Sequence, residues 1–207
     1  MDYNPSANNA FQRMLATMNG LADLFLRAKH WQLFLLLFVF PILVELAATG
    51  YMPTTLRSWR DLGPGGLVCL GLMWIAMLCL IAWLWAMGSF LNSLQKPGLT
   101  LKLPLFRVAL LYPPVYGVVF FLADLPAKAV FPLHLFALFC VLYCFYFVAK
   151  SLATVNTGRQ VSFRDYGKYL LLLYFFPIGV WRIQPRINQL RGQDRNAPVV
   201  DGRSPGK

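Results

Sequence analysis

Charged residues are scarce in this chain, and acidic residues are the scarcest of them. Only 13% of the 207 residues are charged and 58% are hydrophobic, whereas soluble domains carry about 25% charged residues. The composition therefore excludes an ordinary water-soluble domain. The 19 Lys and Arg residues outnumber the 8 Asp and Glu residues, which gives a formal net charge of +11. The cations lie in short segments beside apolar runs without an aromatic-basic motif, so we expect them to serve topology and lipid contact, and we expect no nucleic-acid partner.

Cysteine and histidine are also rare. The four cysteines lie inside apolar runs and none forms a C-x-x-C pair. Cys140 and Cys144 are four residues apart on one predicted helix, where disulfide geometry is poor. We therefore expect buried, reduced cysteines, no disulfide framework and no metal site.

Familiar catalytic motifs are missing as well. The sequence contains no G-x-S-x-G, H-E-x-x-H or P-loop motif. It has no Asp-rich repeat and no acidic pair at a spacing that suits a two-metal site. The inverted repeats of secondary transporters are not visible either. These absences favour a protein without catalytic residues and without a cofactor.

Long apolar runs dominate what is present. Four of them, residues 31–49, 67–90, 108–125 and 130–152, are long enough to cross a ~30 Å hydrocarbon core at ~1.5 Å per residue. The chain is therefore predicted to be an all-α polytopic membrane helical bundle. A fifth run, residues 169–183, would reach only ~22 Å and contains Pro177 and Gly179. We predict a short re-entrant or interfacial segment there, the alternative being a short, tilted fifth span.

The bundle is predicted to occupy residues 11–191 as one domain. Apolar residues recur at helical spacing in residues 11–27, which indicates an amphipathic helix in the membrane interface. Ser162, with Asp165 three residues later, has the pattern of a capping box that begins a helix. Residues 1–10 and the basic tail 192–207 are predicted to be disordered.

The distribution of basic residues predicts the orientation. With four spans, sixteen of the nineteen Lys and Arg residues fall on one side of the membrane, whereas a fifth span would divide them ten against nine. The positive-inside rule favours the first arrangement. We therefore expect both termini in the cytoplasm.

Three polar residues are predicted to lie at one depth. Glu45 comes one turn before the outer end of the first span, His134 one turn after the outer start of the fourth, and Asp124 at the end of the third. By helix rise all three lie within ~6 Å of the same boundary. Glu45 and His134 could share a proton, which makes this trio the candidate intramembrane polar site. The alternative is that Glu45 bonds to a neighbouring side chain and only holds helices together.

The carboxy-terminal segment is predicted to lie at the inner membrane surface. Arg182, Arg186 and Arg191 follow a helix that is interrupted at Pro177 and Gly179. Near anionic head groups each arginine would contribute about 1 kcal/mol. They are the candidate lipid head-group contacts; a protein partner or a simple orientation signal are the alternatives.

Several motifs resemble a family of small, uncharacterised bacterial multi-pass membrane proteins. They are AKHWQLF (residues 28–34), FPLHLF (131–136), YFVAK (146–150) and FPIGVWRIQPRIN (176–188). The resemblance touches the first, fourth and fifth apolar stretches and implies a bacterial inner membrane location. It carries over no activity.

These observations favour a non-enzymatic structural or accessory subunit that contacts anionic lipid at its cytoplasmic face. Beyond the bilayer, a protein partner or a second copy of the chain are the partners to consider. One alternative is a small proton- or cation-coupled transporter or channel that uses Glu45 and His134. Another is a membrane-embedded enzyme on lipid, with the same two residues as its acid–base pair.

Overall fold

The computed structural model describes residue 20 and residues 22–49, 63–96, 98–99, 101–123 and 126–196. Within this part of the chain every regular element is a helix. Most of the predicted amphipathic segment 11–27 lies outside the described residues, as do Asp124 and residues 1–10. Residues 22–27, at its end, are helical.

The first membrane helix is continuous but changes its hydrogen-bonding pattern. It consists of α2 (His30–Phe34), the π-helical turn η1 (Leu35–Val39) and α3 (Phe40–Ala48). The Phe40 N–H donates to the carbonyl of Leu35, five residues back. Pro41 follows at once and has no N–H to continue the α-helical ladder, so the π-turn accommodates the proline without breaking the helix.

Three longer helices follow. They are α4 (Pro64–Ser93), α5 (Leu103–Leu122) and α6 (Ala127–Thr157). Two of them, α4 and α6, extend past the predicted spans at both ends, whereas α5 begins five residues early and ends three residues short. Together with residues 30–48, this gives four helices long and apolar enough to cross a membrane, and the predicted four-span, all-α bundle is confirmed. The 30 residues of α4 measure ~45 Å, more than the ~30 Å hydrocarbon core. α6, of 31 residues, is equally long and ends at Gly158, whose φ of 66° suits a glycine C-cap.

The last two helices form a hairpin. α7 (Phe163–Tyr174) and α8 (Phe176–Asn196) are separated by Phe175, whose φ of −84° and ψ of 62° interrupt the helix. A Cβ at position 179 would overlap the carbonyl oxygen of Leu172, so the helices meet backbone to backbone at the buried Gly179. Residues 169–183 thus comprise the end of α7, Phe175 and the beginning of α8. Neither helix is among the four that are long and apolar enough to cross a membrane.

The structure corrects the prediction for the tail. Residues 192–196 continue α8 as helix, although they were predicted to begin a disordered tail. Pro185 lies inside the same helix and does not end it. Its ring removes one donor, the one that would reach the carbonyl of Trp181, and this loss is tolerated within a helix that packs on neighbours.

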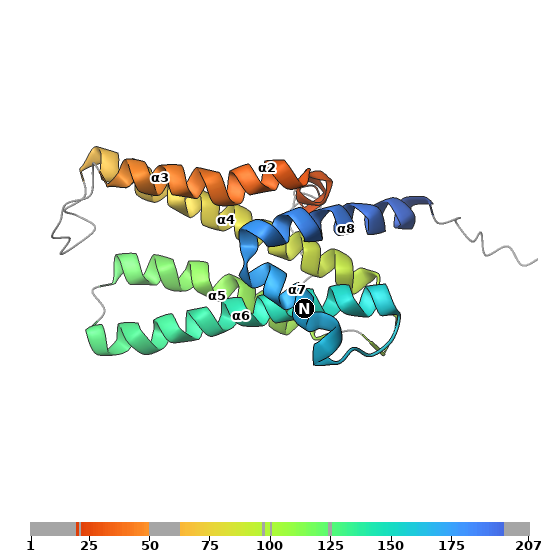
Figure 1. Ribbon diagram of the computed structural model, residues 1–207. Coiled ribbons are helices and arrows are strands. Elements are labelled where there is room, and N and C mark those ends of the chain that lie inside the picture. Colours follow the sequence, from red (N-terminus) through yellow and green to blue (C-terminus); the bar gives the residue numbers. More distant parts are fainter. Residues whose placement is uncertain are drawn as a thin grey trace, which may run out of the picture.

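The helices pair in a simple arrangement (Figure 1): α3 lies along α4, α5 lies along α6, and α4 also contacts α5 and α6. α4 and α5 approach closely at Gly88 of α4, where a Cβ would lie 2.5 Å from Cζ of Phe106. Phe106 stacks on Phe147 of α6 with ring centroids 4.3 Å apart, and both rings are fully buried. These contacts place the main core where α4, α5 and α6 meet.

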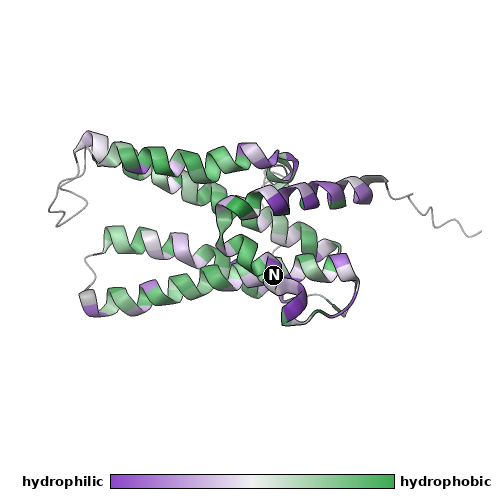
Figure 2. Ribbon diagram, in the orientation of Figure 1, coloured by the Kyte–Doolittle hydropathy of each residue, from purple (hydrophilic) through white to green (hydrophobic). Residues whose placement is uncertain are grey.

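Polar residues gather at one end of the bundle. Figure 2 shows hydrophobic residues along the four long helices and hydrophilic residues along α8 and around the nearby helix ends. We call this the basic end: it comprises the end of α4, the beginning of α5, the end of α6 and the hairpin of α7 and α8. By contrast, many large apolar side chains of the spans are exposed, for example Leu46, Val115 and Phe139, as expected of surfaces that face acyl chains.

The capping box at α7 is present. The Ser162 N–H donates to the Asp165 carboxylate at 3.0 Å, and Arg159 lies 3.3 Å from the same side chain. The backbone hydrogen bond from Ser162, helped by the Arg159 charge, lowers the pKa of Asp165 below its usual 3.8.

Acidification is expected to weaken the beginning of α7 only at very low pH. Because the folded pKa of Asp165 is lowered, its stabilisation is complete above about pH 4 and is lost as the pH falls through the lowered value. The thermal unfolding midpoint of Asp165→Asn in detergent should therefore lie below that of the wild type at pH 7, and the two should converge as the pH falls through the lowered pKa of Asp165. Asp194→Asn, at an exposed site on α8, is the control. Equal midpoints for Asp165→Asn and the wild type at pH 7 would contradict the role assigned to this carboxylate.

Candidate functional site

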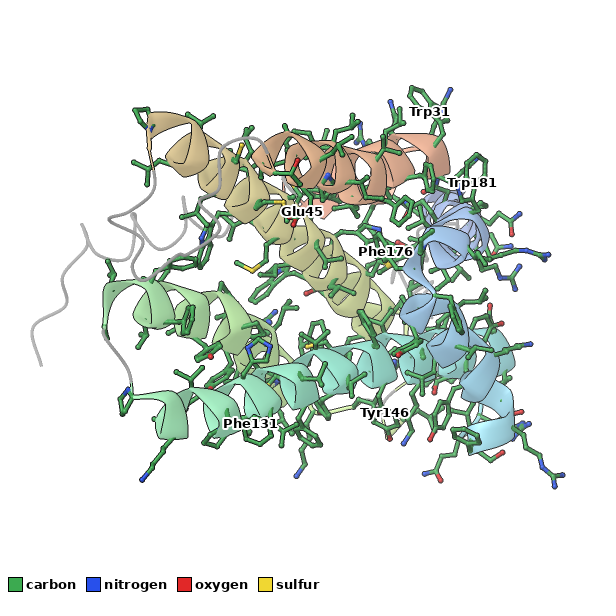
Figure 3. All side chains as sticks on the ribbon, turned by 60° about the vertical axis from the view of Figure 1, so that its left-hand side comes forward. Trp31, Glu45, Phe131, Tyr146, Phe176 and Trp181 are labelled. Atoms are coloured by element: carbon green, nitrogen blue, oxygen red, sulfur yellow. The ribbon has the colours of Figure 1, made fainter. Side chains whose placement is uncertain are left out.

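The structure does not join the predicted intramembrane trio. Glu45 is exposed on α3, and within the described residues no hydrogen bond or ion pair reaches its carboxylate. His134 is exposed on α6, edge-on to Tyr116 of α5 with ring centroids 6.0 Å apart. Figures 1 and 3 place α3 and α6 on opposite sides of the bundle. Asp124 lies outside the described residues. The site of the three residues, with a proton shared between Glu45 and His134, stays a prediction.

The most heavily bonded side chain is instead Gln184 on α8. It is fully buried, and its Oε1 accepts a hydrogen bond from the Trp83 indole N–H at 3.0 Å. Its Nε2 donates to the backbone carbonyls of Phe25 and Ala28, each at 3.1 Å. One amide thus connects α8 to α4 and to the segment before the first span.

Ionic and polar contacts continue this attachment along α8. Arg191 pairs with Asp23, which also pairs with Arg27 at 2.6 Å. On the other side of the helix, Arg186 donates to Asn156 Oδ1 at 3.0 and 2.9 Å, which holds α8 against the end of α6. Both ends of the described chain are therefore tied to the basic end of the bundle.

The three predicted lipid-contacting arginines consequently differ. Arg191 is 9% exposed and forms an ion pair with Asp23, so its charge stabilises the fold and does not face lipid. Arg186 is exposed but bonded to Asn156. Arg182 is exposed, and no hydrogen bond or ion pair involves it among the residues the structure describes.

Further cations at the basic end resemble Arg182 in being exposed: Lys29, Lys96, Lys102, Arg107, Arg164 and Lys168. The described carboxylates nearby do not balance them, because Asp23 and Asp165 are already ion-paired and Asp194 on α8 adds a single negative charge. At the opposite end, the described part of the chain carries Lys128. The basic end therefore presents an uncompensated positive surface.

Aromatic rings fix the level of this surface relative to the first span. Trp31 and Trp181 are each 46% exposed and lie near one another in Figure 3. Trp181 packs on His30 with ring centroids 4.5 Å apart, so α8 lies level with the start of the first span. Exposed tryptophan at the end of an apolar helix is typical of the membrane–water interface.

Phe176, at the tip of the hairpin, lies five residues before Trp181 along α8, or ~8 Å away, and packs on Trp83. The tip of the hairpin thus lies closer to the middle of the bundle than Trp31 and Trp181 do.

Gln184 was not singled out as buried by sequence reasoning, although a signal existed. Val180, Ile183, Gln184, Ile187 and Arg191 recur at helical spacing, and all five are buried. A polar residue in such a stripe indicates a bonded interior side chain. Its partners lie about 100 and 160 residues away and could not be identified from spacing.

Metal chemistry finds no support in the described residues, among which no group of three or more His, Cys, Asp or Glu could hold an ion. The fold is that of a multi-pass helical membrane protein. Comparisons with protein-family models, with curated proteins and with solved structures give no match. The resemblance to a bacterial membrane-protein family therefore stays a prediction.

Proposed function

We propose that this chain is a non-enzymatic multi-pass protein of the bacterial inner membrane, a structural or accessory subunit whose basic end contacts anionic lipid on the cytoplasmic side. The proposal rests on one observation: some cations of the basic end are bonded to other side chains, and others are exposed. Arg191 and Arg186 hold α8 to its neighbours, whereas Arg182, which follows the exposed Trp181, and Arg164 and Lys168 on α7 are exposed. Positive charge next to a tryptophan belt suits a surface that meets anionic head groups.

The orientation follows from the same surface. The cytoplasmic leaflet carries anionic lipid, and short flanking segments rich in Lys and Arg are retained on that side. The basic end is therefore proposed to face the cytoplasm, which places the described end of α8 there as well. The extended attachment of α8 to the bundle fits a rigid scaffold rather than a moving gate.

Removing the exposed cations should weaken lipid binding without unfolding the protein. Arg182→Gln should lower the affinity for phosphatidylglycerol about fivefold, since one exposed cation contributes about 1 kcal/mol. Combined with Arg164→Gln and Lys168→Gln, it should lower the affinity more than tenfold. Native mass spectrometry of the purified chain in a neutral detergent, with phosphatidylglycerol and phosphatidylcholine added in turn, measures both.

Lys128→Gln, at the opposite end, is the matched control and should bind as the wild type does. A triple variant that binds phosphatidylglycerol like the wild type would overturn the assignment of lipid contact to these three cations. Substrate turnover by a purified chain that retains no lipid would overturn the non-enzymatic assignment.

A further inference from the structure

Two hollows lie next to each other at the beginning of α5 and share part of their walls. The first, of 660 Å³, is lined by Asn92 at the end of α4 and by residues 101–105 and 108. The second, of 350 Å³, runs between α5 and α6. Leu105 and Val108 line both, so these two residues form a wall that the hollows share along α5. The combined feature begins at the basic end and continues into the apolar part of the bundle.

The first hollow is lined mainly by apolar side chains but also presents one cation and one amide. Lys102 lines it and is exposed. Asn92 lines it too, and among the described residues its buried Oδ1 has no hydrogen-bond partner. One turn further on, Gln95 is 8% exposed, and within the same part of the chain neither polar atom of its amide has a partner. Buried amides are normally satisfied, so an occupant with both hydrogen-bond donors and acceptors, such as a head group that carries hydroxyls and a phosphate, suits these amides.

No acidic residue opposes this charge nearby in the sequence. From residue 62 to residue 123 the chain contains no Asp or Glu, whereas it contains Lys96, Lys102 and Arg107. The Arg107 guanidinium lies 4.9 Å from the centre of the Trp85 ring, which holds it beside the beginning of α5. The first turn of α5 adds N–H groups that no side chain caps. Together these groups match a negatively charged occupant.

The second hollow is almost entirely apolar. Its walls are formed by Ala109 and Tyr112 of α5 and by Phe136, Phe139 and Cys140 of α6. A soluble anion would gain nothing from this groove. A transmembrane helix of a partner would fill the groove but would not satisfy the buried amides and the lysine. An amphiphile satisfies both parts.

We propose that the two hollows together bind one anionic phospholipid. Its head group would lie in the first hollow, between Asn92 and Lys102, and one acyl chain in the second, between α5 and α6. The inference rests on the proposed function, because it gives the lipid contact at the basic end a specific site. That site is on α4, α5 and α6, away from the arginines of α8. It differs from the charged surface around Arg182 in selecting for the shape of the lipid as well as for its charge.

A bulky side chain in the shared wall should displace this lipid. Val108 is 67% exposed, so Val108→Trp fills the junction of the two hollows without crowding a buried position. Val115→Trp, two turns further along the same helix and 60% exposed, lines neither hollow and is the matched control. Native mass spectrometry with one equivalent of phosphatidylglycerol or phosphatidylcholine measures how many lipids each variant retains.

The wild type and Val115→Trp should retain one phosphatidylglycerol, and Val108→Trp should bind it at least tenfold more weakly. Lys102→Gln should reduce the preference for phosphatidylglycerol over phosphatidylcholine about fivefold. Wild-type retention by Val108→Trp, or no preference between the two lipids, would overturn the site. If the variants at Arg182, Arg164 and Lys168 lose the lipid while Val108→Trp keeps it, this site fails and the proposed function stands. If the wild type retains no anionic lipid, both fail.

Discussion

Replacing Gly179 by alanine should destabilise the protein more than any other single methyl group added to α8. The new Cβ would overlap the Leu172 carbonyl oxygen, a backbone atom that cannot swing aside. The hairpin would have to open, and Val180 and Ile183, both fully buried, would lose their packing. Overpacking of this kind costs about 3 kcal/mol, and more where the backbone must move.

A thiol-reactive dye measures this effect during heating, because Cys144 and Cys140 are free and buried in the folded chain. The dye should react with Gly179→Ala at a clearly lower temperature than with the wild type. Gly192→Ala is the matched control: it lies in the same helix with nothing within 4 Å of the added Cβ. It should be neutral or slightly stabilising, since alanine favours helix over glycine. A wild-type midpoint for Gly179→Ala would contradict the close approach of α7 and α8.

Removing the amide of Gln184 should have the second largest effect. Gln184→Met preserves the approximate length of the side chain but leaves the Trp83 N–H and the carbonyls of Phe25 and Ala28 without this partner. A buried polar group left unpaired costs ~1–3 kcal/mol, so a total loss of at least ~3 kcal/mol is expected. Gln184→Ala should cost more still, because it also leaves a cavity.

The position of the damage distinguishes this prediction from general instability. Proteolysis should cut Gln184→Met first near residues 22–28, because that segment loses its attachment to α8. Gln193→Ala, at an exposed site on α8, is the control and should resist cleavage like the wild type. Unchanged cleavage near residues 22–28 in Gln184→Met would show that the amide does not anchor this segment.

The spans were predictable because each is a long apolar run, and length together with apolar composition decides whether a helix can cross a bilayer. Their ends were less predictable. Pro104 beside Lys102 and Arg107 reads as a loop, yet proline in a first turn begins α5. Pro185 likewise does not mark a helix end, since α8 continues through it. A proline marks either a beginning, a tolerated defect or an end, and packing decides which.

The depth of polar residues could be counted from the sequence, but their lateral neighbours could not. Glu45 and His134 share a level by helix rise, yet α3 packs mainly on α4, whereas α6 packs mainly on α5 and α7. Arg191 shows the converse. Its position in a basic tail predicts a contact with lipid head groups. In the structure it forms an ion pair with Asp23, which is far away in the sequence. Side-chain pairing across the bundle depends on helix order and rotation, which one sequence does not encode locally.

The hydrogen bonds from Gln184 to the carbonyls of Phe25 and Ala28 join residues 159 and 156 positions apart, which bears on how the chain is made. A ribosome would deliver all four spans to the bilayer while the glutamine that anchors the start of the chain is still being synthesised. A nascent chain stopped before residue 184 should therefore hold its membrane helices with residues 22–28 still unattached. Completion of the fold waits for the last helix to emerge.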